Sequence, residues 1–284
     1  MAANVHESCL GLVACGGAMP AAIADAALAQ GRRVHVVALK GQTDPGISRF
    51  SHDWVRLGEI GALMRSLRRA GCEDVVIIGS LRRPNIWRSG FDLGFFRHLP
   101  TILRLTRGGD DSVLKRVARF FEAEGFRVRG AHEIVPSLLA PAGVLTSMRP
   151  DEGSDADITR GLALLDVLAP FDVGQAVVVA RGHALAVEAA EGTDAMLKRC
   201  AALRQWGRSR RAGVLVKAPK QGQELRLDMP VIGPRTVEFA AEAGLAGIAV
   251  AAGKVMIAEQ TDMIDMADRH GLFVTGVNTA SSGP

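Results

Sequence analysis

Short runs of almost wholly apolar residues recur along this chain, and most are followed by a turn and a segment with helical spacing. Cys9–Ala14 and Asp74–Gly79 are two such runs in the first half, and Ile248–Ala252 is one in the second. A strand that is apolar along its length is buried on both faces, which is typical of parallel sheets covered by helices. The alternation of strands and helices therefore predicts an α/β fold with a doubly wound parallel sheet.

The expected elements fall into two groups. In the first, the pattern predicts helices over 20–30, Glu59–Ala70 and Ser112–Glu124, and strands over Cys9–Ala14, Arg33–Leu39, Val55–Leu57, Asp74–Gly79 and Arg127–Arg129. In the second, it predicts helices over Ala156–Leu168, Asp194–Leu203, Val237–Ala243 and Met263–His270, and strands over Gln175–Ala180, Ala184–Glu188, Val214–Lys217, Ile248–Ala252 and Leu272–Gly276.

Prolines and a glycine separate the two groups, at Pro136, Pro141, Gly143 and Pro150. Such residues interrupt regular structure, so we place a domain boundary near Ala142. Residues 1–142 are expected to form an N-terminal Rossmann-like domain with a parallel sheet. Residues 143–284 are expected to form a C-terminal α/β catalytic domain with a mixed sheet.

The charge balance restricts the kind of partner. The 284 residues carry a net charge of +4 and a pI near 9.1. This excess of positive charge favours an anionic partner, such as a phosphorylated small molecule or an anionic membrane surface. Nucleic acid is the weaker interpretation because no recognition motif accompanies the basic residues.

The cysteines and the apolar segments bear on the protein's surroundings. The four cysteines have neither CxxC nor zinc-site spacing, so reduced thiols of a cytosolic protein are expected. No stretch approaches the ~18 apolar residues needed to span a bilayer. The N-terminus lacks the basic region of a secretory signal. We therefore expect a soluble or peripheral protein.

The most polar loop of the chain follows the apolar strand Val214–Lys217. Residues 218–233 combine charges of both signs with glutamines, Gly222 and two prolines, and Pro234 and Thr236 indicate the start of the next helix. Loops held by a rigid scaffold are where binding and catalytic groups collect. We interpret this segment as an active-site loop with Asp228 as its chemical centre.

Two glycine-containing turns are candidate ligand sites. Gly16-Gly17 follows the first strand, where backbone N–H groups at a helix start could hold a phosphate. The dinucleotide fingerprint is incomplete because its third glycine is missing and Lys40, not an acid, follows the second strand. This argues against a nicotinamide cofactor, whereas a phosphate site and a plain tight turn both stay open. Gly108-Gly109-Asp110-Asp111 precedes another helix and could be an N-cap or a ligand or metal contact.

Acidic residues also gather where a strand of the second half ends, in the segment Glu188–Asp194. In α/β folds, ligands bind on the carboxyl side of the strands. One interpretation is structural, with Thr193 as the helix cap and Asp194 in the first turn. The other is a metal site, because hard cations bind carboxylate oxygens. The residues alone do not separate the two.

Aromatic and aliphatic residues alternate with arginines between Arg82 and Arg107. Helices that pack on the sheet are the commoner source of such spacing. The alternative is a surface that binds acyl chains, with cations meeting headgroups and aromatic rings meeting the chains. Burial of ten methylenes would contribute roughly 8 kcal/mol, so one bound acyl chain would dominate the affinity.

Several stretches together carry a family resemblance: Leu10–Pro20, Gly109–Val117, Phe121–Thr146, Asp172–Val179, Leu185–Leu197, 214–237 and Ala243–Val250. In combination they resemble the UDP-2,3-diacylglucosamine pyrophosphatases of the LpxI type. The resemblance covers nearly the whole chain and is more specific than any single motif above. Gln221 and Glu224 depart from the family pattern, which has proline and aspartate there, whereas Arg226 and Asp228 keep their places.

The resemblance implies a hydrolase of lipid A synthesis that splits UDP-2,3-diacylglucosamine into 2,3-diacylglucosamine 1-phosphate (lipid X) and UMP. It implies dependence on Mg²⁺ or Mn²⁺, attack of water on the sugar-side phosphorus, and a substrate held between the two domains. The expected enzyme is cytoplasmic and peripheral at the inner membrane, with no nucleic-acid partner, and a homodimer is open.

The resemblance also suggests roles for single residues. Lys217 and Arg226 would stabilise charge on the reacting phosphate, and Asp228 would hold the metal or deprotonate the water. The expected metal ligands are Asp228, Asp194 and Glu191. The expected substrate-binding residues are Gly16, Gly17, Ser80, Asp110, Asp111, Gln175, Gly192, Thr193, Gln223 and Thr236. A different nucleotide-sugar hydrolase and a non-catalytic lipid-nucleotide binding protein remain as alternatives.

Overall fold

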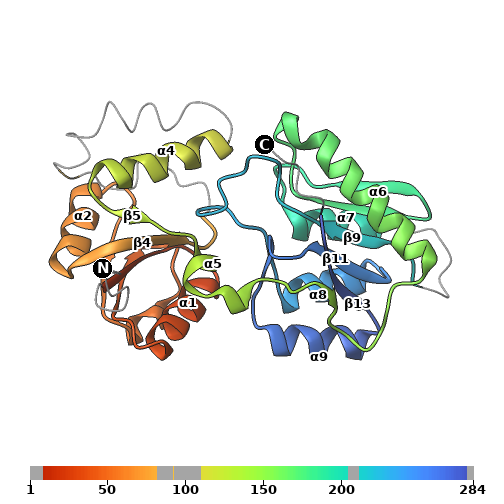
Figure 1. Cartoon of the computed structure of the whole chain (residues 1–284), viewed down its shortest axis with the longest axis horizontal. Helices are drawn as coiled ribbons and strands as arrows, with labels where there is room; N and C mark the ends of the chain where they lie inside the picture. Colours follow the sequence, from red (N-terminus) through yellow and green to blue (C-terminus); the bar gives the residue numbers. More distant parts are fainter. Residues whose placement is uncertain (1–8, 82–91, 93–109, 204–210, 280–284) are drawn as a thin grey trace, which may run out of the picture. The chain divides into compact units, whose positions relative to one another are not determined.

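The computed structural model of the chain describes residues 9–81, 92, 110–203 and 211–279 (Figure 1). Contacts divide the chain into two compact units. The first unit comprises Met1–Pro136 together with Glu224–Asp228, and the second comprises Ser137–Gln223 together with Met229–Pro284. The main division therefore lies between Pro136 and Ser137. The short segment Glu224–Asp228 belongs to the first unit although its neighbours along the chain belong to the second.

The first unit is built on a wholly parallel sheet in the order β3-β2-β1-β4-β5. Its strands are β1 (Cys9–Ala14), β2 (Val34–Leu39), β3 (His52–Val55), β4 (Cys72–Ile78) and β5 (Arg127–Val128). Every residue of β1 and β2 is buried, as expected for strands covered on both faces. This confirms the α/β class and the parallel sheet inferred from the sequence.

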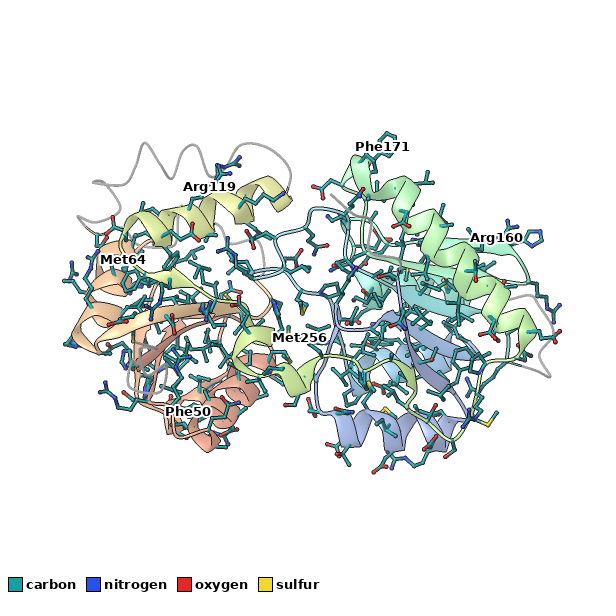
Figure 2. All side chains as sticks on the ribbon, in the orientation of Figure 1. Phe50, Met64, Arg119, Arg160, Phe171 and Met256 are labelled. Carbon is teal, nitrogen blue, oxygen red and sulfur yellow. The ribbon has the colours of Figure 1, made fainter. Side chains whose placement is uncertain are left out.

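Helices cover both faces of this sheet. They are α1 (Met19–Ala29), α2 (Ile60–Arg69), α4 (Asp110–Ala123) and the short α5 (Ala131–Ile134). Figure 1 shows α1 and α4 on opposite sides of the strands. Leu63, Met64 and Leu67 of α2 share one apolar cluster with Phe121 of α4, and Figure 2 labels Met64 within this unit.

A residue far along the chain stabilises the start of α2. The Asp92 carboxylate accepts hydrogen bonds from the backbone N–H groups of Gly61 and Ala62, at 3.2 and 2.8 Å. The first N–H groups of a helix have no partner within the helix, and an acid there also interacts favourably with the helix dipole. Asp92 thus supplies the N-terminal cap that Glu59, the residue before the helix, does not provide through its side chain.

The second unit contains a mixed sheet in the order β6-β13-β11-β9-β7-β8. Its strands are β6 (Gly143–Val144), β7 (Ala176–Ala180), β8 (His183–Val187), β9 (Val214–Lys217), β11 (Gly247–Ala251) and β13 (Phe273–Val277). The central β9, β11 and β13 run parallel, and β6 and β7 run antiparallel to their neighbours. A separate parallel pair joins β10 (Val231–Ile232) to β12 (Met256–Ile257). The mixed sheet confirms the fold expected for this half.

The helices of the second unit are α6 (Glu152–Leu168), α7 (Thr193–Leu203), α8 (Pro234–Glu242) and α9 (Gln260–His270). Figure 1 shows α6 on one side of the sheet and α8 and α9 on the other. An added Cβ on Gly161 of α6 would lie only 2.5 Å from Val216, so glycine permits the close approach of helix and strand. The predicted helix start at Pro234 is confirmed.

Most predicted elements are present with ends shifted by a few residues, but the third strand was misplaced. The prediction put it at Val55–Leu57, whereas β3 covers His52–Val55. This strand lies at the edge of the sheet, where apolar patterning is weak. Because His52 and Asp53 are polar, the apolar pattern did not predict it. A tight turn joins β7 to β8, with positive φ at Arg181 and Gly182, of 52° and 76°. Among the described residues, no helix is long and apolar enough to cross a membrane.

Candidate active site

Four predicted site residues meet at one end of the mixed sheet. Gln175 precedes β7, Lys217 ends β9, and Thr193 begins α7 shortly after β8. The register pairs Ala176 of β7 with Lys217, so the start of one strand lies beside the end of the other. Gln223, on the loop after β9, reaches the same place. Its side-chain nitrogen donates to the side-chain oxygen of Gln175 at 3.1 Å.

Glu188 links these residues from the end of β8. One oxygen of its carboxylate accepts from the Thr193 hydroxyl at 2.7 Å, and the other accepts from the Gln175 N–H at 3.0 Å. Lys217 Nζ donates to the Thr193 hydroxyl oxygen at 2.8 Å. Glu188 and Lys217 are only 6% and 5% exposed, so the chain of hydrogen bonds satisfies two buried charged side chains. The arrangement holds an ammonium group in a fixed position at the carboxyl end of β9.

The loop after β9 is fastened to the same unit by Lys220. Its ammonium forms an ion pair with Asp172, and its backbone N–H donates to the Gln223 side-chain oxygen at 2.8 Å. Asp172 has a left-handed backbone with φ of 54°. Neither Lys220 nor Asp172 was predicted as a site residue. In the sequence, both were only charged residues, Lys220 in the polar loop and Asp172 two residues before Gly174.

The two predicted metal ligands on this unit are both engaged by arginines. Glu191 pairs with Arg199 at 2.7 Å, and Asp194 pairs with Arg235 at 2.9 Å. Hydrogen bonds from backbone N–H groups and from Arg199 hold the pKa of the Glu191 carboxyl below its ordinary value. Each ion pair uses one oxygen of its carboxylate, so a metal ion at this point would lie close to a guanidinium group. Within the described part of the chain, no three His, Cys, Asp or Glu side chains form a metal-binding group.

Gly192 and Thr236 stand at helix starts. Gly192 has φ of +82°, and its carbonyl accepts from the Met196 N–H in the first turn of α7 at 3.1 Å. Thr236 is buried, and its hydroxyl oxygen lies 3.4 Å from the Gly233 nitrogen that precedes α8. These contacts are those of helix caps. A contact of either residue with substrate stays a prediction.

The second half of the polar loop lies on the first unit, in the turn Glu224–Asp228. The Glu224 carbonyl accepts from the N–H groups of Leu227 and Asp228, at 3.1 and 2.9 Å. Leu227 packs against the apolar cluster of that unit. Apolar surface buried by Leu227 thus helps to attach the turn to this unit.

Arg226 is held by carboxylates on two sides. Its Nε and one Nη donate to the two Glu224 oxygens at 2.8 Å each, and its other Nη donates to Glu122 of α4 at 2.7 Å. The hydrogen bonds to Arg226 lower the pKa of the Glu224 carboxyl, and those to Glu224 and Glu122 raise the pKa of the guanidinium. The three predicted catalytic residues are therefore divided, with Lys217 on the second unit and Arg226 and Asp228 on the first.

The glycine turn of the first unit joins two strand ends. Gly16 and Ser80 exchange backbone hydrogen bonds of 2.9 Å in each direction, so the Gly16 N–H is already used by protein. A Cβ on Gly79, which has φ of +105°, would approach the Gly16 oxygen to 2.5 Å. Gly17 is exposed, with φ of +94°. For Gly16, the structure favours the tight turn over a phosphate contact.

Two other predictions concern residues at or beyond the limits of the described segments. Asp110 and Asp111 are the first residues of α4, so the helix starts two residues before the predicted Ser112. The acyl-binding surface predicted between Arg82 and Arg107 lies outside the described residues except for Asp92.

Together these features define a protein of two α/β units, one with a parallel sheet and one with a mixed sheet that bears a buried polar network. Residues 9–138 match the family model of the LpxI N-terminal domain, and residues 141–275 match that of the LpxI C-terminal domain. The chain therefore belongs to the LpxI family. It is similar to UDP-2,3-diacylglucosamine pyrophosphatase LpxI of Caulobacter vibrioides, with 42% identity over 272 residues, covering 95% of this chain and 97% of that protein.

Proposed function

We propose that this chain is an enzyme of lipid A biosynthesis that hydrolyses the diphosphate of UDP-2,3-diacylglucosamine. The observation that carries the proposal is 42% identity, over 95% of the chain, to a relative named for this pyrophosphatase activity. Both family domains are matched as well, which supports transfer of the activity as a whole.

In the proposed reaction, water attacks the sugar-side phosphorus. Its oxygen becomes part of 2,3-diacylglucosamine 1-phosphate, and the bond from that phosphorus to the bridging oxygen breaks. UMP leaves with the bridging oxygen. Catalysis of phosphoryl transfer consists mostly of positioning and of stabilising negative charge, so preorganised cations and donors are what the protein must supply.

The network at the end of β9 fits the binding of a phosphate. Lys217 presents a cation whose position is set by Thr193 and Glu188. Gln223 is oriented by Gln175 and by the backbone of Lys220. A fixed ammonium acts on developing negative charge without reorganising during the reaction. We assign Lys217 to charge stabilisation and Gln175, Thr193 and Gln223 to substrate binding.

Asp228 is our candidate for the residue that acts on water. A carboxylate can accept the proton of an attacking water or hold the metal that activates it. The guanidinium of Arg226 is bound to Glu224 and Glu122. We therefore assign Arg226 to holding the turn that carries Asp228, in place of the phosphate contact inferred from the resemblance.

Mg²⁺ or Mn²⁺ is part of the proposal. Mg²⁺ is usually bound through one or two carboxylates together with substrate phosphates, and keeps several waters. We propose Asp228 for such a role, as the family resemblance implies; the carboxylates of Glu191 and Asp194 each form an ion pair with an arginine. When bound, the ion would neutralise charge on the diphosphate.

Incubation of the purified chain with UDP-2,3-diacylglucosamine and Mg²⁺ tests the proposal, with UMP and lipid X as the measured products. In H₂¹⁸O, the label is expected in lipid X and not in UMP. Binding without UMP release would identify a lipid-nucleotide carrier. Faster release of UMP from a UDP-sugar without acyl chains would identify a different nucleotide-sugar hydrolase.

The cellular setting is proposed on the same basis. A substrate with two acyl chains resides in a membrane, so we expect a cytoplasmic enzyme that is peripheral at the inner membrane. Sedimentation with vesicles of anionic lipid tests the membrane contact, and analytical ultracentrifugation tests for a homodimer. No nucleic-acid partner is expected.

A further inference from the structure

A second group of polar side chains lies in the first unit, at the amino ends of its strands. His35 is near the start of β2, Ser51 and Asp53 flank the start of β3, and Ser66 is on α2. The Val36 N–H donates to the Ser51 carbonyl at 2.8 Å, which fixes the backbone of Ser51 against β2. Gly16 and Ser80 lie at the opposite, carboxyl ends of β1 and β4. This group is thus separate from the residues assigned to diphosphate hydrolysis.

The hydrogen bonds of this group have a defined direction. Ser66 Oγ donates to Asp53 at 2.6 Å, so its oxygen accepts the hydrogen bond from His35 Nε2, at 2.9 Å. The same ring nitrogen lies 3.4 Å from the Asp53 carboxylate. Nε2 therefore carries the proton, and Nδ1 presents a lone pair. Nδ1 lies 3.0 Å from the Ser51 oxygen, so the Ser51 hydroxyl donates to it.

The environment keeps the imidazole able to accept a proton. Burial lowers the pKa of His35 below its ordinary value, although Asp53 opposes this effect. The hydrogen bond from Ser66 and the charge of Arg69 lower the pKa of Asp53, which stays a carboxylate. His35 is 7% exposed, whereas Ser51 is exposed to solvent. A base held inside the protein thus meets the hydroxyl of a residue at the surface.

From this geometry we propose that Ser51 is a nucleophilic serine that forms a covalent adduct with acyl or phosphoryl esters. His35 takes the Ser51 proton at Nδ1 as the Oγ bond to carbon or phosphorus forms. The bond to the leaving group breaks, and the leaving group receives that proton. Asp53 and Ser66 orient the ring, as the third residue of a catalytic triad orients the base. Arg69, bound to Asp53 and with a 73% exposed side chain, adds a cation beside the site.

A fluorophosphonate probe tests the proposal on the full-length protein. The Ser51 Oγ–P bond forms, the P–F bond breaks and HF is released, and peptide mass spectrometry locates the adduct. We expect labelling at Ser51 at least about 100-fold faster than at Ser147, an exposed serine of the second unit. A parallel arm with p-nitrophenyl acetate distinguishes acyl from phosphoryl preference.

Variants separate the nucleophile from its base. Ser51→Ala should abolish the adduct and leave release of UMP from UDP-2,3-diacylglucosamine unchanged. His35→Gln should slow labelling about 100-fold or more, and Ser66→Ala should slow it less, because Nε2 keeps its direct contact with Asp53. Labelling of Ser51 no faster than that of Ser147 would overturn the proposal. So would full labelling of a folded His35→Gln protein.

The pH dependence decides the case in which His35→Gln does not fold. Labelling of the unaltered protein should rise with pH as His35 loses its proton and then level off. The charged or titratable groups that act on this ring are Asp53, Arg69 and His52. Because burial lowers the pKa of His35, the window must extend into acid, and a flat profile from pH ~4 to ~8 would show that no histidine base assists Ser51.

Discussion

Up to Asp228, the polar loop after β9 has two halves that belong to different units. The first half, up to Gln223, stays with the second unit, and the second half, Glu224–Asp228, belongs to the first. Immediately before the first half, at the end of β9, buried Lys217 donates to a neutral hydroxyl that is itself bound to a buried glutamate. In the second half, partly exposed Arg226 binds two carboxylates directly.

The comparison shows that similar composition can serve different purposes. A buried, hydrogen-bonded charge is costly to disturb, because its neighbours are left unsatisfied in a medium of low dielectric. A partly exposed ion pair contributes much less, because solvent screens it. We therefore expect substitution of Lys217 to act through chemistry and folding. The second half should respond mainly through Asp228.

The largest expected effect is that of Asp228→Ala. If Asp228 acts on water, turnover should fall by about 10³-fold or more, while the substrate still binds. The measurement is kcat for UMP release together with substrate binding by calorimetry. Asp228→Asn keeps the shape of the side chain and serves as the matched variant. Retention of kcat in both variants would remove Asp228 from the mechanism.

Lys217→Met tests the charged residue at the end of β9, immediately before the loop. It keeps a long apolar side chain and removes the ammonium, so kcat/KM should fall about 100-fold or more. Lys220→Met is the control, because it removes a lysine of the same loop that pairs with Asp172. Its effect should be within a few-fold. Equal losses in both variants would mean that general positive charge matters, and not the position of Lys217.

Glu188→Gln tests whether the network holds the fold as well as the site. The amide group cannot accept at both positions, so either Thr193 or the Gln175 N–H loses its partner. The free energy of unfolding should fall by about 1–3 kcal/mol in chemical denaturation. Glu191→Gln, at an exposed position, should stay within about 0.5 kcal/mol. A Glu188 variant as stable as the Glu191 variant would contradict the network.

Strand ends explain why the residues of this network meet, and the family resemblance supplied the individual residues. The apolar run before Lys217 and the run around Ala176–Ala180 predicted two strands, and adjacent strands place their flanking residues side by side. Gln175, Thr193, Lys217 and Gln223 were all predicted as site residues, and all four join the network. Here local pattern and tertiary structure agree.

The contacts of the turn Glu224–Asp228 could not be predicted from the sequence in this way. The ion pair of Arg226 with Glu122 joins residues 104 positions apart, and no local pattern indicates it. The same holds for Asp92, which caps α2 from 30 and 31 positions away. Leu227 was one apolar residue among many charges, yet its packing decides to which unit the turn belongs. Contacts of this kind depend on the assembled core, not on periodicity.

Arg226→Lys is expected to have a smaller effect than the substitutions above. Lysine retains the charge but cannot form the two-pronged contact with Glu224, so the turn should loosen. We expect kcat to fall by about tenfold or less, and Glu122→Gln to produce part of the same loss. A double-mutant cycle should show coupling of about 0.2–1 kcal/mol in stability. A loss as large as that of Lys217→Met would restore a direct role for Arg226 at the phosphate.

The smallest expected effect is the acid response of the turn. Bonding to Arg226 lowers the pKa of Glu224 from the ordinary 4.5, so its contribution to stability is fully present above that value. The contribution should disappear as the pH falls through the lowered pKa of the folded protein. Hydrogen exchange at the Leu227 and Asp228 amides, which donate to the Glu224 carbonyl, reports this loosening. Protection in the unaltered protein should exceed that in Glu224→Gln near neutral pH and converge with it in acid. A difference that persists unchanged to low pH would show that shape, and not the ion pair, holds the turn.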